Sequence, residues 1–163
     1  MIQTCVTDLL YFGDGASCSS ENSQKYAMIH ACKDPCHRRA VGYSEKSLNP
    51  AHPSYLAYEE DNQLFLNLID PPVPLFKLES FKIFLAFATC ANGSDQPVLI
   101  HCNQGQSRAP SLALLYMAKG LGLLPNESYA AARADFEEKF PYAPGKGIEI
   151  FLEENWFDLD EDI

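Results

Sequence analysis

The sequence lacks several features that would place it in a common class of protein. It has no uninterrupted apolar run of the roughly 18 residues that a membrane span needs. Its first residues carry neither a basic segment nor a long apolar stretch, so we expect no secretory signal peptide. Internal repeats and low-complexity segments are also lacking. We therefore expect a cytoplasmic protein that does not bind a membrane.

Positive charge is also scarce. The chain has 12 Lys and Arg residues against 22 Asp and Glu residues, for a net charge of −10 at pH 7. Because an acidic surface repels the phosphate backbone, we do not expect nucleic acid as a partner. Acidic residues are concentrated near the end of the chain, at Glu153, Glu154, Asp158, Asp160, Glu161 and Asp162. We expect residues 157–163 to form a solvated acidic tail.

Apolar residues, by contrast, are plentiful. The 163 residues are 47% hydrophobic and 12% aromatic, which is enough for one compact domain with a substantial core. There are six cysteines. A chain of this size can fold without disulfides, and no export signal is visible, so we expect reduced thiols.

Strand and helix patterns alternate along the chain. Strands are expected over 5–12, 26–31, 63–69 and 98–100. Helices are expected over 76–91, 108–120, 126–139 and 147–156. The strand at 98–100 is apolar throughout, which is typical of a central parallel strand covered on both faces. The sequence therefore predicts an α/β domain with a mostly parallel sheet of four or five strands and helices on both faces.

A short loop joins this central strand to the helix predicted from Arg108. It begins at Cys102 and continues through Asn103, Gln104, Gly105, Gln106 and Ser107. Where a buried strand ends and a helix begins, backbone N–H groups converge and the helix N-terminus adds partial positive charge. Such a cradle binds a tetrahedral oxyanion. Gly105 allows the loop backbone angles that a Cβ would obstruct.

The two ends of the loop carry complementary chemistry. Amide dipoles and a nearby guanidinium favour the thiolate form of Cys102, which is a nucleophile. The planar fork of Arg108 can bind two oxygens of a phosphoryl group. We expect Ser107 to donate a hydrogen bond near the thiolate, and His101 to order the loop through hydrogen bonds. The plainer alternative is that Cys102 is only a buried thiol.

The order His101-Cys102-x5-Arg108 resembles the active-site loop of the cysteine-dependent protein tyrosine and dual-specificity phosphatases. This resemblance implies their fold, and hydrolysis of phosphotyrosine, with phosphoserine and phosphothreonine as further candidates, through a phosphocysteine. It implies no cofactor and no metal. The partners would be a phosphoprotein or phosphopeptide, with inorganic phosphate or another tetrahedral oxyanion in the loop. The resemblance covers 63–120 and 140–156, within a single domain over 1–156 in which residues 1–62 are less typical.

Such a reaction needs an acid to protonate the leaving oxygen. Asp70 closes the strand at 63–69, lies 32 residues before Cys102 and is followed by prolines. The resemblance assigns the acid's role to Asp70. The alternative is a turn residue before proline. Asp95 is a weaker rival, because it precedes the central strand and should lie at the wrong end of the sheet.

Two departures from the resemblance bear on function. Many members carry Ser or Thr after the loop arginine, whereas this chain has Ala109. Hydrolysis of the phosphocysteine could then be slow, or Ser107 could take over some of the role. The loop also lacks the lysines of inositol-lipid phosphatases, which disfavours a lipid substrate. A phosphoresidue-binding protein with weak turnover and a rhodanese-like sulfurtransferase stay open as alternatives.

A second group of reactive side chains lies near residue 30. Its metal-competent members are His30, Cys32, Cys36 and His37. Their spacing matches no common structural zinc pattern, so we favour small apolar fillers at the end of a strand over a zinc site. One alternative is a reversible disulfide of Cys32 or Cys36 with Cys102. Another is attraction of an anionic substrate by the cations Lys33, His37, Arg38 and Arg39.

Overall fold

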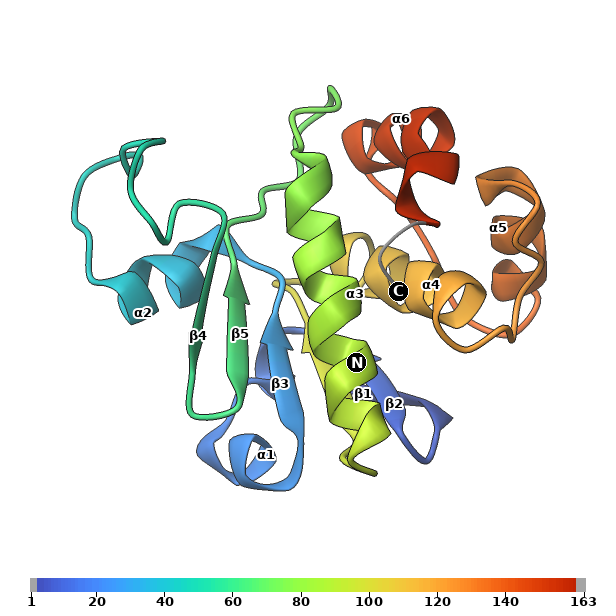
Figure 1. Ribbon diagram of the computed structural model, residues 1–163, viewed down its shortest axis with the longest axis horizontal. Helices are drawn as coiled ribbons and strands as arrows, with labels where there is room; N and C mark the ends of the chain where they lie inside the picture. The colour runs from blue at the N-terminus through green and yellow to red at the C-terminus, as the bar shows by residue number, and fades with distance from the viewer. Residues whose placement is uncertain (1–2, 161–163) are drawn as a thin grey trace.

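The computed structural model describes residues 3–160, which form a six-stranded sheet with the order β1-β2-β6-β3-β5-β4 (Figure 1). The strands are β1 (Gln3–Thr7), β2 (Leu10–Gly13), β3 (Ala27–His30), β4 (Ala57–Glu60), β5 (Gln63–Leu66) and β6 (Val98–His101). The four central strands are parallel, and each outer strand is antiparallel to its neighbour. The predicted mostly parallel sheet is confirmed.

The four long helices lie close to their predicted positions, whereas the two short helices that precede them were not predicted. The helices are α1 (Ser20–Lys25), α2 (Arg38–Val41), α3 (Leu78–Gly93), α4 (Arg108–Lys119), α5 (Tyr129–Glu137) and α6 (Lys146–Asn155). Short helical turns add η1 (Gly15–Ser17), η2 (Lys33–His37) and η3 (Phe157–Leu159). Helix α5 begins later than predicted because the Ser128 hydroxyl accepts a hydrogen bond from the N–H of Ala131 and caps it.

The number of strands differs from the expected four or five. The segment predicted as one strand over 5–12 is a hairpin, and its turn is closed by a hydrogen bond from the Leu9 N–H to the Thr7 hydroxyl. The other added strand is β4, which turns into β5 through Asp61 and Asn62. Both residues have positive φ, at 49° and 64°, a conformation that Asp and Asn tolerate in tight hairpins. Both additions are outer strands, so the central order is unaffected.

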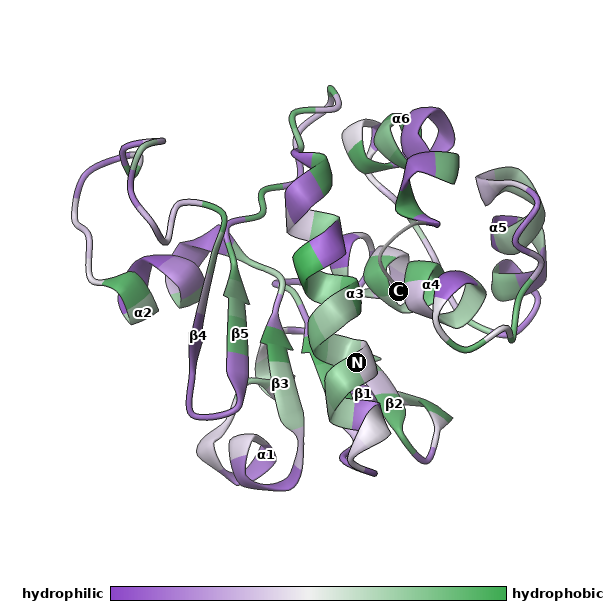
Figure 2. Cartoon of the chain, in the orientation of Figure 1, coloured by the Kyte–Doolittle hydropathy of each residue, from purple (hydrophilic) through white to green (hydrophobic). Residues whose placement is uncertain are grey.

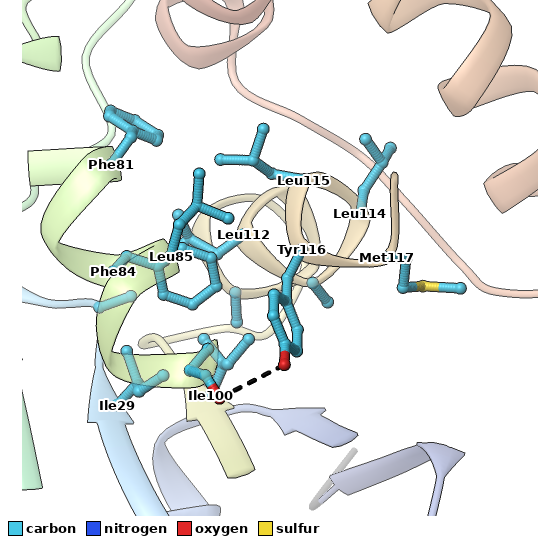
Figure 3. Close-up of a cluster of buried hydrophobic side chains, with 14 of the residues drawn as sticks. Ile29, Phe81, Phe84, Leu85, Ile100, Leu112, Leu114, Leu115, Tyr116 and Met117 are labelled. Carbon is cyan, nitrogen blue, oxygen red and sulfur yellow. Dashed lines mark hydrogen bonds between the residues drawn. The ribbon is translucent and has the colours of Figure 1, made fainter. Parts of the chain in front are cut away.

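One face of the sheet carries the main core. The side chains of Ile29 and Ile100 point to this face and pack beneath α3 and α4 (Figure 3), and Leu64 belongs to the same buried cluster. Figure 2 shows that β3 and the part of α3 lying over it are hydrophobic. Within α4, the residues from Ala109 to Ala118 are all buried. The start of α4 is thereby fixed between the sheet and the other helices.

The opposite face is thinner. Alternate residues of the same strands point there and form a small cluster of Tyr26, Met28 and Leu99. His30 and His101 continue these two strands on the same face. Ser20 and Ser23 of the short helix α1 line a cavity on this face together with His30, so the predicted helices on both faces are confirmed.

Residues 157–160 do not form part of a solvated tail, contrary to expectation. Leu159 is fully buried, and the carboxylate of Asp160 accepts a hydrogen bond from the Lys119 ammonium at 2.5 Å. Residues 157–160 therefore pack against the domain, because an apolar side chain anchors them. Residues 161–163 lie outside the described residues. None of the helices described between residues 3 and 160 has the length and apolar character of a membrane span.

The packing of α3 on the sheet can be tested by removing one of its buried side chains. Phe84 is fully buried, whereas Phe157 is 67% exposed. We expect Phe84→Ala to lower the free energy of unfolding by about 3–5 kcal/mol, because it removes a buried ring and leaves a cavity. The control Phe157→Ala should change it by less than about 0.5 kcal/mol. Urea unfolding measures both, and equal effects would contradict this packing.

Candidate active site

The loop between β6 and α4 surrounds the sulfur of Cys102. This thiol is buried, and its Sγ accepts hydrogen bonds from the backbone N–H groups of Gly105 at 3.2 Å and Ala109 at 3.4 Å. Gly105 has φ +70°, which explains why a glycine is needed there. Because two N–H dipoles point at one atom, the loop favours negative charge at that position.

Three distant segments hold the loop in place. The Gly15 N–H donates to the carbonyl of Asn103 at 3.1 Å. The Asn103 amide donates to the carbonyl of Asp34 in η2 at 3.0 Å. The Ala143 N–H donates to the carbonyl of Gln106 at 2.9 Å. The loop conformation is thus fixed by tertiary contacts as well as by its own sequence.

Arg108 is the first residue of α4, and its guanidinium is oriented by two acceptors. Nη1 donates to the Leu68 carbonyl at 2.9 Å, and Nη2 donates to Oδ1 of Asn103 at 2.6 Å. Among residues 3–160, the buried Nε of Arg108 finds no hydrogen-bond partner. A buried donor left unpaired costs about 1–3 kcal/mol. An oxyanion bound in the loop would supply the acceptor.

All but two of the predicted site residues line one cavity of about 290 Å³, and the two that are not in its lining are Gly105 and His101. It is lined by Asp70, Cys102, Asn103, Gln104, Gln106, Ser107, Arg108, Ala143 and Gly145. Asp70, 32 residues before Cys102, therefore lies at the same cavity as the thiol and the guanidinium. Asp95 precedes β6 and lies at its opposite end, as expected.

Asp70 is held by a contact that the sequence did not predict. Its Oδ1 accepts a hydrogen bond from the Ser107 hydroxyl at 3.1 Å, and that hydroxyl accepts one from the Gly145 N–H at 2.8 Å. Ser107 was expected to donate toward Cys102, but its hydroxyl is engaged by Asp70. A Cβ at Gly145 would lie 2.2 Å from Asp70 Oδ1, so this close approach requires glycine.

The four reactive residues near position 30 do not stay together. His37 turns away, with its ring nitrogens 2.9 Å from the Tyr43 hydroxyl and 2.8 Å from the Ser54 carbonyl, and burial lowers its pKa. His30 instead lies against His101, where two ring nitrogens are 2.7 Å apart. This pair joins two strands that are distant in sequence.

Two thiols complete that grouping. Cys18 Sγ lies 3.7 Å from His30 Nδ1, and Cys36 Sγ lies 3.8 Å from His101 Nε2. Hydrogen bonds with Cys36, His101 and His30 hold the pKa of Cys18 far below its usual range. Sequence reasoning included two members of this group and missed Cys18 and His101, which come from other segments. All six cysteines are free thiols, as expected.

The basic residues Lys33 and Arg38 bind groups close to them in the sequence. Lys33 donates to the Lys46 carbonyl at 2.9 Å, and Arg38 pairs with Asp34 and also reaches the Lys46 carbonyl. These side chains tie η2 and α2 to the following loop. Their contacts lend no support to the hypothesis that they attract substrate to Cys102.

Comparison with known proteins rests on structure alone. The sequence matches no family model and no curated protein. Human DUSP28 superposes with a TM-score of 0.65 at 16% identity, over 98% of this chain and 95% of that one. A human tyrosine phosphatase-like serine/threonine/tyrosine-interacting protein gives 0.63 at 18% identity, over 93% of each chain. The chain has the fold of the dual-specificity phosphatases.

This fold likeness extends over nearly the whole chain. A mouse putative dual specificity phosphatase, solved complexed with zinc tungstate, matches with a TM-score of 0.63 at 16% identity, covering 97% of this chain and 88% of that one. The dual-specificity phosphatase fold predicted from the sequence is therefore confirmed.

The unpaired Nε of Arg108 leads to a binding test. We expect Arg108→Lys to weaken binding of vanadate or tungstate about 10- to 100-fold, because lysine keeps the charge but loses the fork of donors. Isothermal titration calorimetry measures the affinity. The control is Arg39→Lys, at an exposed residue of α2 outside this cavity, which should bind as the unaltered protein does. Equal affinity in both variants would contradict this geometry.

Proposed function

We propose that this protein is a cysteine-dependent protein phosphatase of the dual-specificity type. The proposal rests on three groups that lie at one cavity: the sulfur of Cys102, the guanidinium of Arg108 and the carboxyl of Asp70. Two backbone N–H groups donate hydrogen bonds to that sulfur. The shared fold, and the tungstate oxyanion named with one neighbour, support the proposal.

The first step is transfer of the phosphoryl group to the enzyme. The Cys102 thiolate attacks phosphorus, the bond to the leaving oxygen breaks, and Asp70 in its acid form donates a proton to that oxygen. Arg108 and the loop N–H groups stabilise the charge on the other phosphoryl oxygens. The Ser107 hydrogen bond to Oδ1 orients the carboxyl for this transfer.

The second step releases phosphate. A water molecule attacks phosphorus, the Asp70 carboxylate accepts its proton, and the sulfur–phosphorus bond breaks to restore the thiolate. The position after Arg108 is Ala109, whose buried methyl group offers no hydroxyl to the departing sulfur. Because Ser107 is engaged by Asp70, it is poorly oriented to replace that hydroxyl. We therefore expect the second step to limit turnover.

A phosphoprotein is the substrate class that the cavity favours. Among residues 3–160, Arg108 is the one cationic side chain in its lining, with neutral amides at Asn103, Gln104 and Gln106. One cation suits a single phosphoryl group, whereas a polyphosphorylated lipid headgroup calls for more. We propose phosphotyrosine as the main substrate, with phosphoserine and phosphothreonine as further candidates.

Ala109 favours one second candidate, a protein that binds phosphorylated residues and turns them over weakly. One fold neighbour is described as phosphatase-like and interacting. The sulfurtransferase alternative gains less support, because persulfide transfer needs no carboxylic acid, and Asp70 lies at the cavity.

Substitution of the nucleophile and of the acid tests the mechanism. We expect Cys102→Ser to abolish vanadate-sensitive hydrolysis of phosphotyrosine peptides. Asp70→Asn should lower kcat by about 10²–10⁴-fold, because the leaving oxygen then departs without a proton. Stopped-flow release of phosphate measures both rates.

The matched control for the acid is Asp95→Asn, which changes the same chemical group at the other end of β6. It should leave kcat unaltered. The proposal would be wrong if Cys102→Ser kept full activity. If Asp70→Asn and Asp95→Asn gave the same kcat, the role of Asp70 would be wrong.

The two steps can be separated by a burst experiment. With para-nitrophenyl phosphate, we expect one equivalent of nitrophenol to appear quickly, followed by slower steady turnover. Ala109→Ser should raise the steady rate about tenfold or more without changing the burst, because a hydroxyl hydrogen bond stabilises the departing thiolate. Peptide affinity without any burst would favour the binding protein instead.

A further inference from the structure

The thin face of the sheet carries a second cluster that the proposed reaction does not use. One donor atom from each of Cys18, His30, Cys36 and His101 lies within 4.8 Å of all the others. We propose that these four side chains bind one Zn²⁺ ion as a structural Cys2His2 site. The proposal does not depend on the phosphatase chemistry.

The distances between donor atoms fit a tetrahedral ion. Zinc bonds of about 2.3 Å to sulfur and 2.0–2.1 Å to nitrogen place tetrahedral donors about 3.3–3.8 Å apart. The two sulfur–nitrogen distances, from Cys18 to His30 and from Cys36 to His101, are 3.7 and 3.8 Å. The two ring nitrogens, 2.7 Å apart, would separate by about 0.6 Å to fit the same tetrahedron.

Both histidine rings have their outer nitrogen next to an oxygen acceptor. His30 Nε2 lies 2.8 Å from Oε1 of Gln63, and His101 Nδ1 lies 3.4 Å from the carbonyl of Cys102. If the outer nitrogens donate to these oxygens, the inner nitrogens of two neutral rings present lone pairs to each other. That arrangement is repulsive unless a cation lies between them. Anchoring of the outer nitrogen is also how metal-binding histidines are oriented in proteins.

Charge balance and ligand type select zinc. Two thiolates and two neutral imidazoles neutralise one divalent ion, so the mostly buried site carries no net charge. Thiolate and imidazole ligands suit Zn²⁺, whereas Mg²⁺ and Ca²⁺ prefer oxygen ligands.

The surroundings hold the ligands and leave an entry path. The His30 ring stacks on Phe65 with centroids 4.3 Å apart, which fixes its plane. His30, Cys36 and Cys18 line an open cavity of about 300 Å³ together with Ser19 and Ser23. Cys18 is exposed and the other three ligands are buried, so an ion can reach the site from the Cys18 side.

The ion would act as a positioning group for the active-site loop. His101 directly precedes Cys102, and Cys36 lies in η2, whose Asp34 carbonyl accepts the amide of Asn103. A bond from zinc to each of these segments would fasten β3, β6 and η2 together behind the loop. The ion would lie outside the cavity of Cys102 and would have no role in the chemical steps.

Metal content of the whole chain tests the proposal directly. Purified protein incubated with excess Zn²⁺ under reducing conditions and then dialysed should retain one zinc per chain by plasma mass spectrometry. Cys18→Ser should lose the ion, and because Cys18 is exposed this change spares the core. Cys90→Ser, at an exposed thiol of α3, is the control and should retain one equivalent.

Two further measurements address the ligands and their support. Co²⁺ in place of zinc should show thiolate-to-metal charge-transfer absorption in the unaltered protein and in Cys90→Ser. Gln63→Leu, which removes the acceptor for His30, should weaken zinc affinity about 10- to 100-fold in a chelator competition.

A folded, reduced protein that retains no zinc would overturn the proposal and would favour a proton shared between the two rings. Retention of zinc with unchanged affinity in Cys18→Ser would overturn this choice of ligands. Neither outcome bears on the phosphatase proposal, because activity is not the readout.

Discussion

The convergence of two backbone N–H groups on the sulfur of Cys102 is the constraint on which the rest of the site depends. Gly105 and Ala109 can both reach Sγ because the loop turns tightly from the end of β6 into the first turn of α4. That turn needs a positive φ at Gly105 and a rigid strand and helix on either side. The apolar core beneath α4 supplies that rigidity, so packing far from the cavity determines its shape.

The approach of Asp70 to the loop depends on the absence of side chains. Gly145 leaves room for the carboxylate, and a Cβ at Gly147 would lie 2.2 Å from the carbonyl oxygen of Val73. The first turn of α6 thus packs directly on the backbone that follows Asp70. The Ser107 hydroxyl then links the two, and the acid is held at a fixed position relative to the thiol.

The two faces of the sheet carry different groups of side chains. Along β3 and β6, alternate residues face the main core, and the residues between them face the thin side. The parallel register places His30 directly beside His101. The same alternation that buries Ile29 and Ile100 therefore delivers two imidazoles to one point, next to the thiols of Cys18 and Cys36.

Residue patterns were enough to predict the α/β fold, the central strand near 98–100 and the loop from Cys102 to Arg108, because these features depend on neighbours along the chain. The same patterns missed the outer strands, since a hairpin such as β4–β5 rests on two turn residues, Asp61 and Asn62. Only the tertiary structure shows that the Ser107 hydroxyl donates a hydrogen bond to Asp70. It also places Cys18 and His101 next to His30 and Cys36. Contacts between distant segments follow from strand order and packing, which no local pattern of residues encodes.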